Sequence, residues 1–516
     1  MKYFFPDESP TLPSRDRLKA LRAYIKATWT TLTRTQSHIL DAAKDSKLNH
    51  EAGTPWPVHV SPHEDIDQVK ASLQQALSPE ELSQIRVAML PAEVDQIEEH
   101  GLLYLPKDYV VPGGRFNELY GWDSYFIVLG LLHDGEITLA RNMVDLHIYE
   151  IEHYGTVLNG NRTYMLDRSH PPLLTPTVLR VFQQVQDEAW LRSLLPAIEN
   201  YYFYWTVPPH LNPATGLSRY YALGHGPAPE VVCDEVDEYG RSHYDRVCDY
   251  YRIFADDQPF NDYDLKLYYD EERDCLTELF YQGDRSMRES GFDITNRFGP
   301  FSADIIHYAP VCLNVLLYQM ERDLAQIHQI LGHLDSASHW QQQSDRRRAH
   351  IDQFLWDDRT GLYLDYNFRT GQRRPYPFAT TFMPLWAGVA SEHQAKRLVD
   401  NLPMFESCGG LLTSTQVSGN QWDAPFGWAP LHLFAIAGLR RYGYEKEARR
   451  IACKFIHLVT QEFERSGTIM EKYDVVKCSA NVSNEIQFGY SSNEIGFGWT
   501  NGVLLELLSY YAQSSS

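Results

Sequence analysis

The chain has 516 residues, with 68 acidic and 46 basic side chains, and its formal net charge is −22 at pH 7. Such an excess of negative charge disfavours binding to nucleic acids and to anionic membranes, because both need a basic surface. The sequence contains no hydrophobic run long enough to cross a membrane, and its first residues lack the apolar core of a signal peptide. We therefore expect a protein with a small-molecule ligand.

The seven cysteines are scattered along the chain. Their number is odd and no two of them form a C-x-x-C pair, which is typical of reduced thiols in the cytoplasm. We expect neither a metal site nor a cofactor. Aromatic residues make up 13% of the chain, a share that suits carbohydrate binding without proving it.

The first 50 residues show amphipathic spacing that predicts one long or two shorter helices. Residues 51–105 mix Pro and Gly with short apolar stretches and predict strands or an irregular cap. We interpret residues 1–104 as a helical or irregular extension packed on a catalytic barrel formed by residues 105–516.

Helical periodicity dominates the rest of the chain, since apolar residues recur three and four positions apart. The predicted helices cover residues 127–132, 139–151, 175–186, 190–203, 303–333, 336–355, 393–401, 430–442, 445–464 and 500–513. Long loops over residues 153–174 and 207–262 separate some of them, and loops of this length are usually functional. Recurrent helical hairpins with long loops predict an all-α toroid.

The stretch Pro112 to Phe126 (PGGRFNELYGWDSYF) carries the strongest functional signal. Two glycines allow a tight turn before Arg115, and the aromatic residues Phe116 and Trp122 follow, with Asp123 next. Flat rings suit the apolar face of a sugar, and charged groups suit its hydroxyls. A turn followed by a helix with an aromatic core face is the alternative interpretation.

This stretch resembles the first signature of the trehalases, and Gln421 to Pro430 (QWDAPFGWAP) resembles the second. The resemblance covers about residues 105–510, with the motifs in family order. It implies a barrel of six helical hairpins, (α/α)6, with the active site at one end. It also implies that Gln421 and Trp422 take part in substrate binding.

Hydrolysis of a glycosidic bond needs two carboxyl groups, an acid and either a base or a nucleophile. One candidate is Asp293, since Gly291 and Phe292 precede it and Arg297 follows. An acid that caps the next helix is the alternative. The run resembles the trehalase segment that carries the general acid, which implies this role for Asp293 and places Gly291 at the substrate.

The second candidate is Glu471, which follows two apolar residues and precedes Lys472, Tyr473 and Asp474. A surface pair of Glu471 and Lys472 is the alternative. The run resembles the trehalase segment that carries the general base, which implies that role for Glu471. In an inverting site the two carboxyls should lie about 6.5–9.5 Å apart.

A third run, Asn159 to Pro172, resembles a trehalase segment that binds sugar. The match implies sugar contacts for Asn159 and Arg168, although Arg168 could instead form a salt bridge with Asp167. His170 stands where trehalases usually have Gln, and a neutral His can still donate one hydrogen bond.

The glycine-rich flap of the trehalases and the segment that grips their second glucose are not recognisable. In these places stand residues 475–493, with Tyr490, and residues 242–252, with Tyr244, Arg246 and Arg252. We interpret these four residues as possible contacts of the leaving group. The pattern resembles trehalase-like hydrolases that act on smaller solutes.

The sequence therefore favours an inverting α-glycoside hydrolase that cleaves glucosylglycerol to glucose and glycerol. Glucosylglycerate or mannosylglycerate hydrolysis and α,α-trehalase activity are alternatives within the same chemistry. An inactive sugar-binding protein is the alternative of another class. The sequence does not indicate an oligomeric state.

Overall fold

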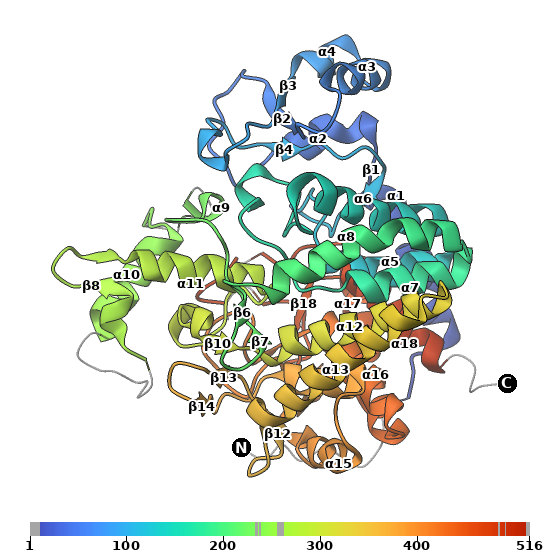
Figure 1. Ribbon diagram of the computed structural model, residues 1–516, viewed down its shortest axis with the longest axis vertical. Coiled ribbons are helices and arrows are strands. Elements are labelled where there is room, and N and C mark those ends of the chain that lie inside the picture. Colours follow the sequence, from blue (N-terminus) through green and yellow to red (C-terminus); the bar gives the residue numbers. More distant parts are fainter. Residues whose placement is uncertain are drawn as a thin grey trace.

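The computed structural model describes residues 11–232, 236, 239–254, 263–482, 486–490 and 492–511. The contacts between helices close a ring at its centre, and most helices of this ring are labelled in Figure 1. Within the described residues, six inner helices each pack against the next, and the last packs against the first. In ring order they are α5 (Asp123–Asp134), α7 (Leu174–Val185), α12 (Val311–Ile330), α14 (Met383–Ala387), α16 (Ala429–Arg441) and α18 (Gly498–Tyr511).

A second layer of helices surrounds this ring. It consists of α6 (Ile137–Tyr154), α8 (Glu188–Thr206), α13 (Leu334–Phe354), α15 (Glu392–Asp400), α17 (Glu445–Ser466) and α1 (Arg15–Leu32). Inner helices such as α18 are buried almost all round, whereas outer helices such as α13 bury one face only. The prediction of an all-α (α/α)6 barrel is confirmed.

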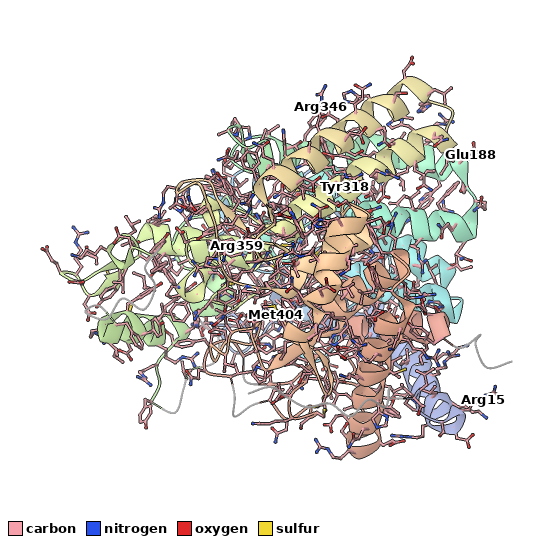
Figure 2. The ribbon with its side chains drawn as sticks, turned by 90° about the horizontal axis from the view of Figure 1, so that it is seen from below. Arg15, Glu188, Tyr318, Arg346, Arg359 and Met404 are labelled. Atoms are coloured by element: carbon pink, nitrogen blue, oxygen red, sulfur yellow. The ribbon has the colours of Figure 1, made fainter. Side chains whose placement is uncertain are left out.

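The two layers can be followed from below (Figure 2). Arg346 of α13 and Arg15 of α1 lie at the periphery and are exposed, whereas Tyr318 of the inner helix α12 is buried. The apolar core thus lies between and inside the rings, and the loops at the helix ends are left to form a site.

Beyond the N-terminal part, four of the described helices lie where none was predicted. They are α14, whose range is given above, and α9 (Pro229–Val232), α10 (His243–Phe254) and α11 (Glu278–Glu289). The expectation of a loop over residues 207–262 is therefore wrong for α9 and α10. Helix α10 buries Tyr244, Val247 and Tyr251, so tyrosines form most of its buried face and a search for aliphatic residues misses it.

The N-terminal part contains a small parallel sheet, which agrees with the alternative of strands that was predicted for residues 51–105. Its strands β2 (Trp56–Val60), β3 (Ile85–Met89) and β4 (Leu102–Leu103) lie in the order β3-β2-β4. Helices α2 (Ile39–Ala43), α3 (Ile66–Ala76) and α4 (Pro79–Ser83) accompany it (Figure 1). These elements share a small apolar core of their own, whereas α1 packs into the core of the barrel. The domain boundary at residue 104 stays a prediction.

The remaining strands form short antiparallel pairs in the loops. They are β1 (Thr33–Arg34) with β5 (Tyr109–Val110), β6 (Leu211–Asn212) with β7 (Leu217–Ser218), β8 (Tyr269–Asp270) with β9 (Cys275–Leu276), β11 (Trp356–Asp357) with β12 (Leu362–Tyr363), β15 (Glu406–Ser407) with β16 (Gly410–Leu411), and β17 (Phe426–Trp428) with β18 (Lys472–Asp474). A further group contains β10 (Tyr308–Ala309), β13 (Tyr366–Asn367) and β14 (Gln372–Arg373).

Six of the seven cysteines lie in the described residues and all six are free thiols, while Cys233 lies outside that part. Among the helices of the described chain, none combines the length and apolar character that a membrane span requires.

Candidate active site

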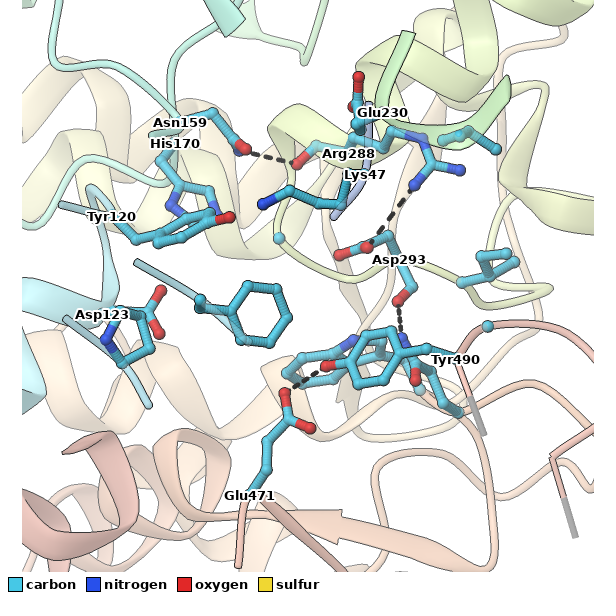
Figure 3. A pocket seen from close by; sticks show the side chains of 18 of the residues that line it. Lys47, Tyr120, Asp123, Asn159, His170, Glu230, Arg288, Asp293, Glu471 and Tyr490 are labelled. Atoms are coloured by element: carbon cyan, nitrogen blue, oxygen red, sulfur yellow. Dashed lines mark hydrogen bonds and ion pairs between the residues drawn. The ribbon is translucent and has the colours of Figure 1, made fainter. Parts of the chain in front are cut away.

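A cavity with a volume of about 150 Å³ gathers most of the candidate residues (Figure 3). At about 10–15 Å³ for each water molecule, it has room for on the order of ten waters, which suits a small glycoside rather than a polysaccharide. The candidates that line it are Arg115, Phe116, Trp122, Asp123, Asn159, Arg168, His170, Arg246, Gly291, Asp293, Gln421, Trp422, Glu471 and Tyr490.

The loop that carries Asp293 follows helix α11 and is fastened by the second signature. The side-chain amide of Gln421 donates a hydrogen bond to the main-chain carbonyl of Asp293. The main-chain N–H of Trp422 donates to the main-chain carbonyl of Ile294 at 3.1 Å. The buried carboxylate of Asp423 accepts hydrogen bonds from the next two residues of the loop, each at 3.0 Å. The second signature thus holds the loop of Asp293 in place.

The carboxyl group of Asp293 faces the cavity, and 35% of its side chain is exposed there. One of its oxygens lies 3.8 Å from a guanidinium nitrogen of Arg288, which also binds Asp284 through two hydrogen bonds of 3.1 Å. Burial raises the pKa of Asp293, and the charge of Arg288 opposes this rise. A raised pKa keeps a proton on the carboxyl, as a general acid requires.

The second carboxyl, Glu471, stands directly before strand β18, which pairs with strand β17 of the second signature. The indole N–H of Trp499 donates to the main-chain carbonyl of Glu471 at 3.2 Å, so the residue is fixed from two sides. Burial raises the pKa of Glu471, while Lys472 at 3.4 Å and the hydroxyl of Tyr490 oppose this rise. Glu471 and Lys472 are both buried, so they are not a surface pair.

The first signature forms an aromatic wall of the cavity. Gly114 has a φ of 56°, and a Cβ atom there would lie 1.8 Å from a carboxylate oxygen of Glu494, so only glycine fits. Trp122 packs edge to face on Phe292 at 5.5 Å, which joins this wall to the acid's loop. Asp123 begins α5, and burial, followed by repulsion from Glu471 and Asp293, raises its pKa well above the usual value.

Asn159 and Arg168 reach the cavity from the third run. The side-chain N–H groups of Asn159 donate to main-chain carbonyls of residues 169 and 288 at 3.4 and 3.2 Å, which leaves its carbonyl oxygen for a sugar hydroxyl. Arg168 lines the cavity and also binds Asp167 at 3.3 Å and Glu230. The alternative of a salt bridge with Asp167 is therefore confirmed, together with the position at the cavity.

His170 is oriented by the first signature. Its Nδ1 accepts a hydrogen bond from the main-chain N–H of Trp122 at 3.2 Å, so the proton of the neutral ring lies on Nε2. Burial lowers the pKa of His170 well below its usual value, so the ring stays neutral. A Cβ atom at Gly291 would lie 3.2 Å from Nε2, so a glycine keeps this donor close to the cavity.

Two of the four leaving-group candidates do not reach the cavity. Tyr244 is buried in α10 and donates its hydroxyl to Asp284 at 2.9 Å. Arg252 is half exposed and binds Asp274 at 2.8 Å. The expectation that Tyr244 and Arg252 contact the leaving group is corrected accordingly, since both are engaged elsewhere.

A family model described as Trehalase matches residues 4–512 of the chain. The chain belongs to the trehalase family. This family consists of O-glycosyl hydrolases, and the resemblance of the motifs is confirmed.

The similar proteins include several trehalases of fungi. The chain is 34% identical to a probable trehalase of Eremothecium gossypii, over 94% of this chain and 72% of that protein. It is 38% identical to the cytosolic neutral trehalase of Kluyveromyces lactis, over 78% of this chain and 56% of that protein. The chain thus spans little more than half the length of some trehalases that it matches.

Solved structures agree with this assignment. The neutral trehalase of Saccharomyces cerevisiae superposes with a TM-score of 0.79 at 33% identity, over 96% of this chain and 94% of that one. A mannosylglycerate hydrolase of Thermus thermophilus reaches a TM-score of 0.50 at 18% identity, over 77% of this chain and 95% of that one, and shows the fold alone.

The trehalase-family cavity also contains residues that the sequence did not indicate. Among them are Lys47, Tyr120, Glu230, His243 and Arg288. Tyr120 stands inside the first signature and Arg288 stands five residues before Asp293, so both could have been found from the sequence. Lys47, by contrast, comes from the N-terminal part, and no local pattern links it to a sugar site.

Proposed function

We propose that this protein is an inverting α,α-trehalase, which hydrolyses trehalose to two molecules of glucose. The observation that carries the proposal is that Asp293 and Glu471, from distant segments, line one aromatic-walled cavity with the sugar-binding candidates. The names of its relatives, trehalases at 34% and 38% identity, support it further. The cytosolic location in several of these names also leads us to infer a cytosolic enzyme.

In this mechanism Asp293 gives its proton to the glycosidic oxygen while Glu471 accepts a proton from the attacking water. The C1–O bond to the leaving glucose breaks, and the bond from the water oxygen to C1 forms on the opposite face. Arg115, Asp123, Asn159 and Arg168 hold the glucose that is attacked, and Phe116 and Trp122 cover its apolar faces.

The leaving-group side of the cavity lies beside Asp293, because the acid must touch the glycosidic oxygen. Arg288 contacts Asp293 there, and Glu230 and Arg246 also line the cavity. Several hydrogen-bonding groups suit a second glucose, which presents four hydroxyls, better than glycerol. The preference for glucosylglycerol that we derived from sequence has no support among the relatives reported above, so glucosylglycerol becomes a competing substrate in the test.

The test compares kcat/KM of the purified protein on trehalose, glucosylglycerol, glucosylglycerate and mannosylglycerate. We expect the highest value on trehalose by at least about 100-fold, since a site built to bind substrate hydroxyls rejects molecules that lack them. Asp293→Asn is the control, and it should lose about 100-fold or more in kcat while unfolding at the same temperature. A higher kcat/KM on any other solute would refute the trehalase assignment, and binding of trehalose without turnover would indicate a sugar-binding protein.

A further inference from the structure

Tyr490 stands between the base and the cavity. Its hydroxyl donates a hydrogen bond to Oε1 of Glu471, and its side chain lines the cavity (Figure 3). Only 1% of the Glu471 side chain is exposed, whereas 35% of the Asp293 side chain is. The acid therefore meets the cavity directly, while the base meets it beneath a tyrosine hydroxyl.

The second carboxylate oxygen of Glu471 gives a water molecule in the cavity no other way to reach the base. Oε2 of Glu471 is buried and accepts no hydrogen bond from the described residues. It lies 3.4 Å from Nζ of Lys472, which itself donates to the side-chain carbonyl of Gln421 at 3.0 Å. The oxygen that lies toward the cavity is thus Oε1, and the hydroxyl of Tyr490 covers it.

Tyr490 is held firmly in this position. The ammonium group of Lys472 lies 3.6 Å from the centre of its ring, and the guanidinium of Arg115 lies 4.9 Å from it. Two residues earlier, Phe488 packs on Phe301 at 4.7 Å. The main-chain N–H of Gln487 donates to the carbonyl of residue 419 at 2.8 Å, which ties the segment to the residues just before the second signature. These contacts keep the hydroxyl on the carboxylate.

We propose that Tyr490 is a catalytic residue that relays the proton from the attacking water to Glu471. Its oxygen takes the proton of the water as its own proton passes to Oε1 of Glu471, so the tyrosine is neutral before and after the step. The water oxygen bonds to C1, the glycosidic bond breaks, and Asp293 protonates the leaving oxygen. The relay deepens the proposed function, since it assumes an inverting glycosidase.

The charges around the base suit such a relay. Lys472 and Asp123 face Glu471 from β18 and α5, and Glu494 faces it from the segment before α18. Burial and the nearby charge of Glu471 raise the pKa of the Tyr490 phenol well above its usual value. The phenol therefore keeps its proton across the pH range of an enzyme assay and remains the donor to Glu471.

The experiment uses Tyr490→Phe and α-glucosyl fluoride, whose fluoride leaves without help from an acid. We expect kcat to fall about 100-fold or more with little change in KM, because the base loses its contact with the water. Tyr250→Phe is the matched control. Tyr250 packs against Phe488 at 6.2 Å and does not line the cavity, so this variant should stay within about twofold of the parent enzyme.

If Tyr490 only covers the base, Tyr490→Phe will be as active as the parent enzyme or more active, and the relay is refuted. A second measurement needs no variant. With α-glucosyl fluoride, kcat of the parent enzyme is measured in mixtures of H2O and D2O. A relay moves two protons and predicts a curved dependence on the deuterium fraction, whereas a straight line would contradict it. Because the fluoride tests the relay independently of trehalose, failure on trehalose alone would count against the proposed function only.

Discussion

Four carboxyl groups line the cavity, and the surroundings of three of them suit different roles in the proposed reaction. Asp293 has an arginine beside it and partial exposure, Glu471 is covered and paired with Lys472, and Asp123 is buried at the start of α5. The pKa of each is raised, chiefly by burial. Because the three groups interact, the pH profile of the enzyme reports on the set rather than on single residues.

His170 offers a test at the scale of one residue. His170→Gln keeps a hydrogen-bond donor at the cavity, and we expect kcat/KM on trehalose to stay within about fivefold of the parent value. His170→Ala removes the donor and leaves the main-chain N–H of Trp122 without its acceptor, so we expect a loss of about 10- to 100-fold. Steady-state kinetics decide this, and equal losses in both variants would show that the ring itself, rather than its donor, is required.

The sequence allowed the two candidate carboxyls and the aromatic wall of the cavity to be predicted, because each stands in a compact motif. Tyr490 was interpreted as a possible contact of the leaving group, and this stays a prediction, but its contact with Glu471 was not foreseen, because it depends on how the described residues between 475 and 493 pack against distant segments. Glu230 and Lys47 escaped prediction for a similar reason. Their place at the cavity results from contacts between segments far apart in the chain.

At the scale of elements, a buried ion cluster joins the N-terminal part to the barrel. Lys47 binds Glu118 at 3.0 Å, and Arg162 binds the same carboxylate at 2.7 Å. Arg162 also donates to main-chain carbonyls of residues 42, 43 and 44, so one arginine ties this segment to the sugar-binding run. Burial acts to raise the pKa of Glu118, but the charges of Lys47 and Arg162 outweigh it and lower the pKa to about 2.

Lys47→Met should therefore destabilise the protein, because it leaves the buried carboxylate with one partner fewer. We expect the free energy of unfolding at pH 7 to fall by about 3–5 kcal/mol. Lys44→Met is the matched control, since Lys44 forms an exposed pair with Asp41 and should change stability by less than about 1 kcal/mol. Urea unfolding followed by circular dichroism provides both values. Similar values for the two variants would contradict the role of the cluster.

The lowered pKa of Glu118 also predicts how a fall in pH affects this ion cluster. Glu118 has a lowered pKa in the folded state, so its contribution to stability is complete above a pH of about 4.5 and is lost as the pH falls toward about 2. Since the cluster holds the segment that carries Lys47, acid should weaken the attachment of the N-terminal part to the cavity wall.

At the scale of the whole molecule, a buried acid lies where two neighbouring helices of the inner ring, α7 and α12, contact each other. Asp323 of α12 accepts hydrogen bonds from Thr175 of α7 at 2.9 Å and from Gln319 at 2.7 Å. Burial raises its pKa to about 7. The folded state therefore holds this proton more tightly than the unfolded chain does, and Asp323 lowers stability as the pH rises from about 4 to about 7.

Asp323→Asn removes this ionisation. The stability of the variant relative to the parent protein should grow by about 2 kcal/mol between a pH of about 5.5 and a pH of about 8, as the ionisation of Asp323 is increasingly penalised in the parent. Chemical unfolding at both pH values measures the change. A constant difference between the two proteins would contradict the raised pKa.

The order of the helices could be predicted from sequence, since the barrel repeats one hairpin and each hairpin has its own periodicity. The closed ring was also expected, from the recurring hairpins and from the family resemblance, whereas the particular contact that closes it, α18 against α5 from the other end of the chain, follows from no local pattern. The same closure brings the base, directly before β18, to the wall that begins with Asp123.

The most direct test of the account follows the first glucose molecules released from trehalose by proton NMR. Attack by water opposite the leaving group turns one α-linked glucose into β-glucose, while the leaving glucose remains α. The account predicts equal amounts of α- and β-glucose in the earliest spectra, before mutarotation mixes them. Release of α-glucose alone would contradict an acid and a base acting across one water molecule.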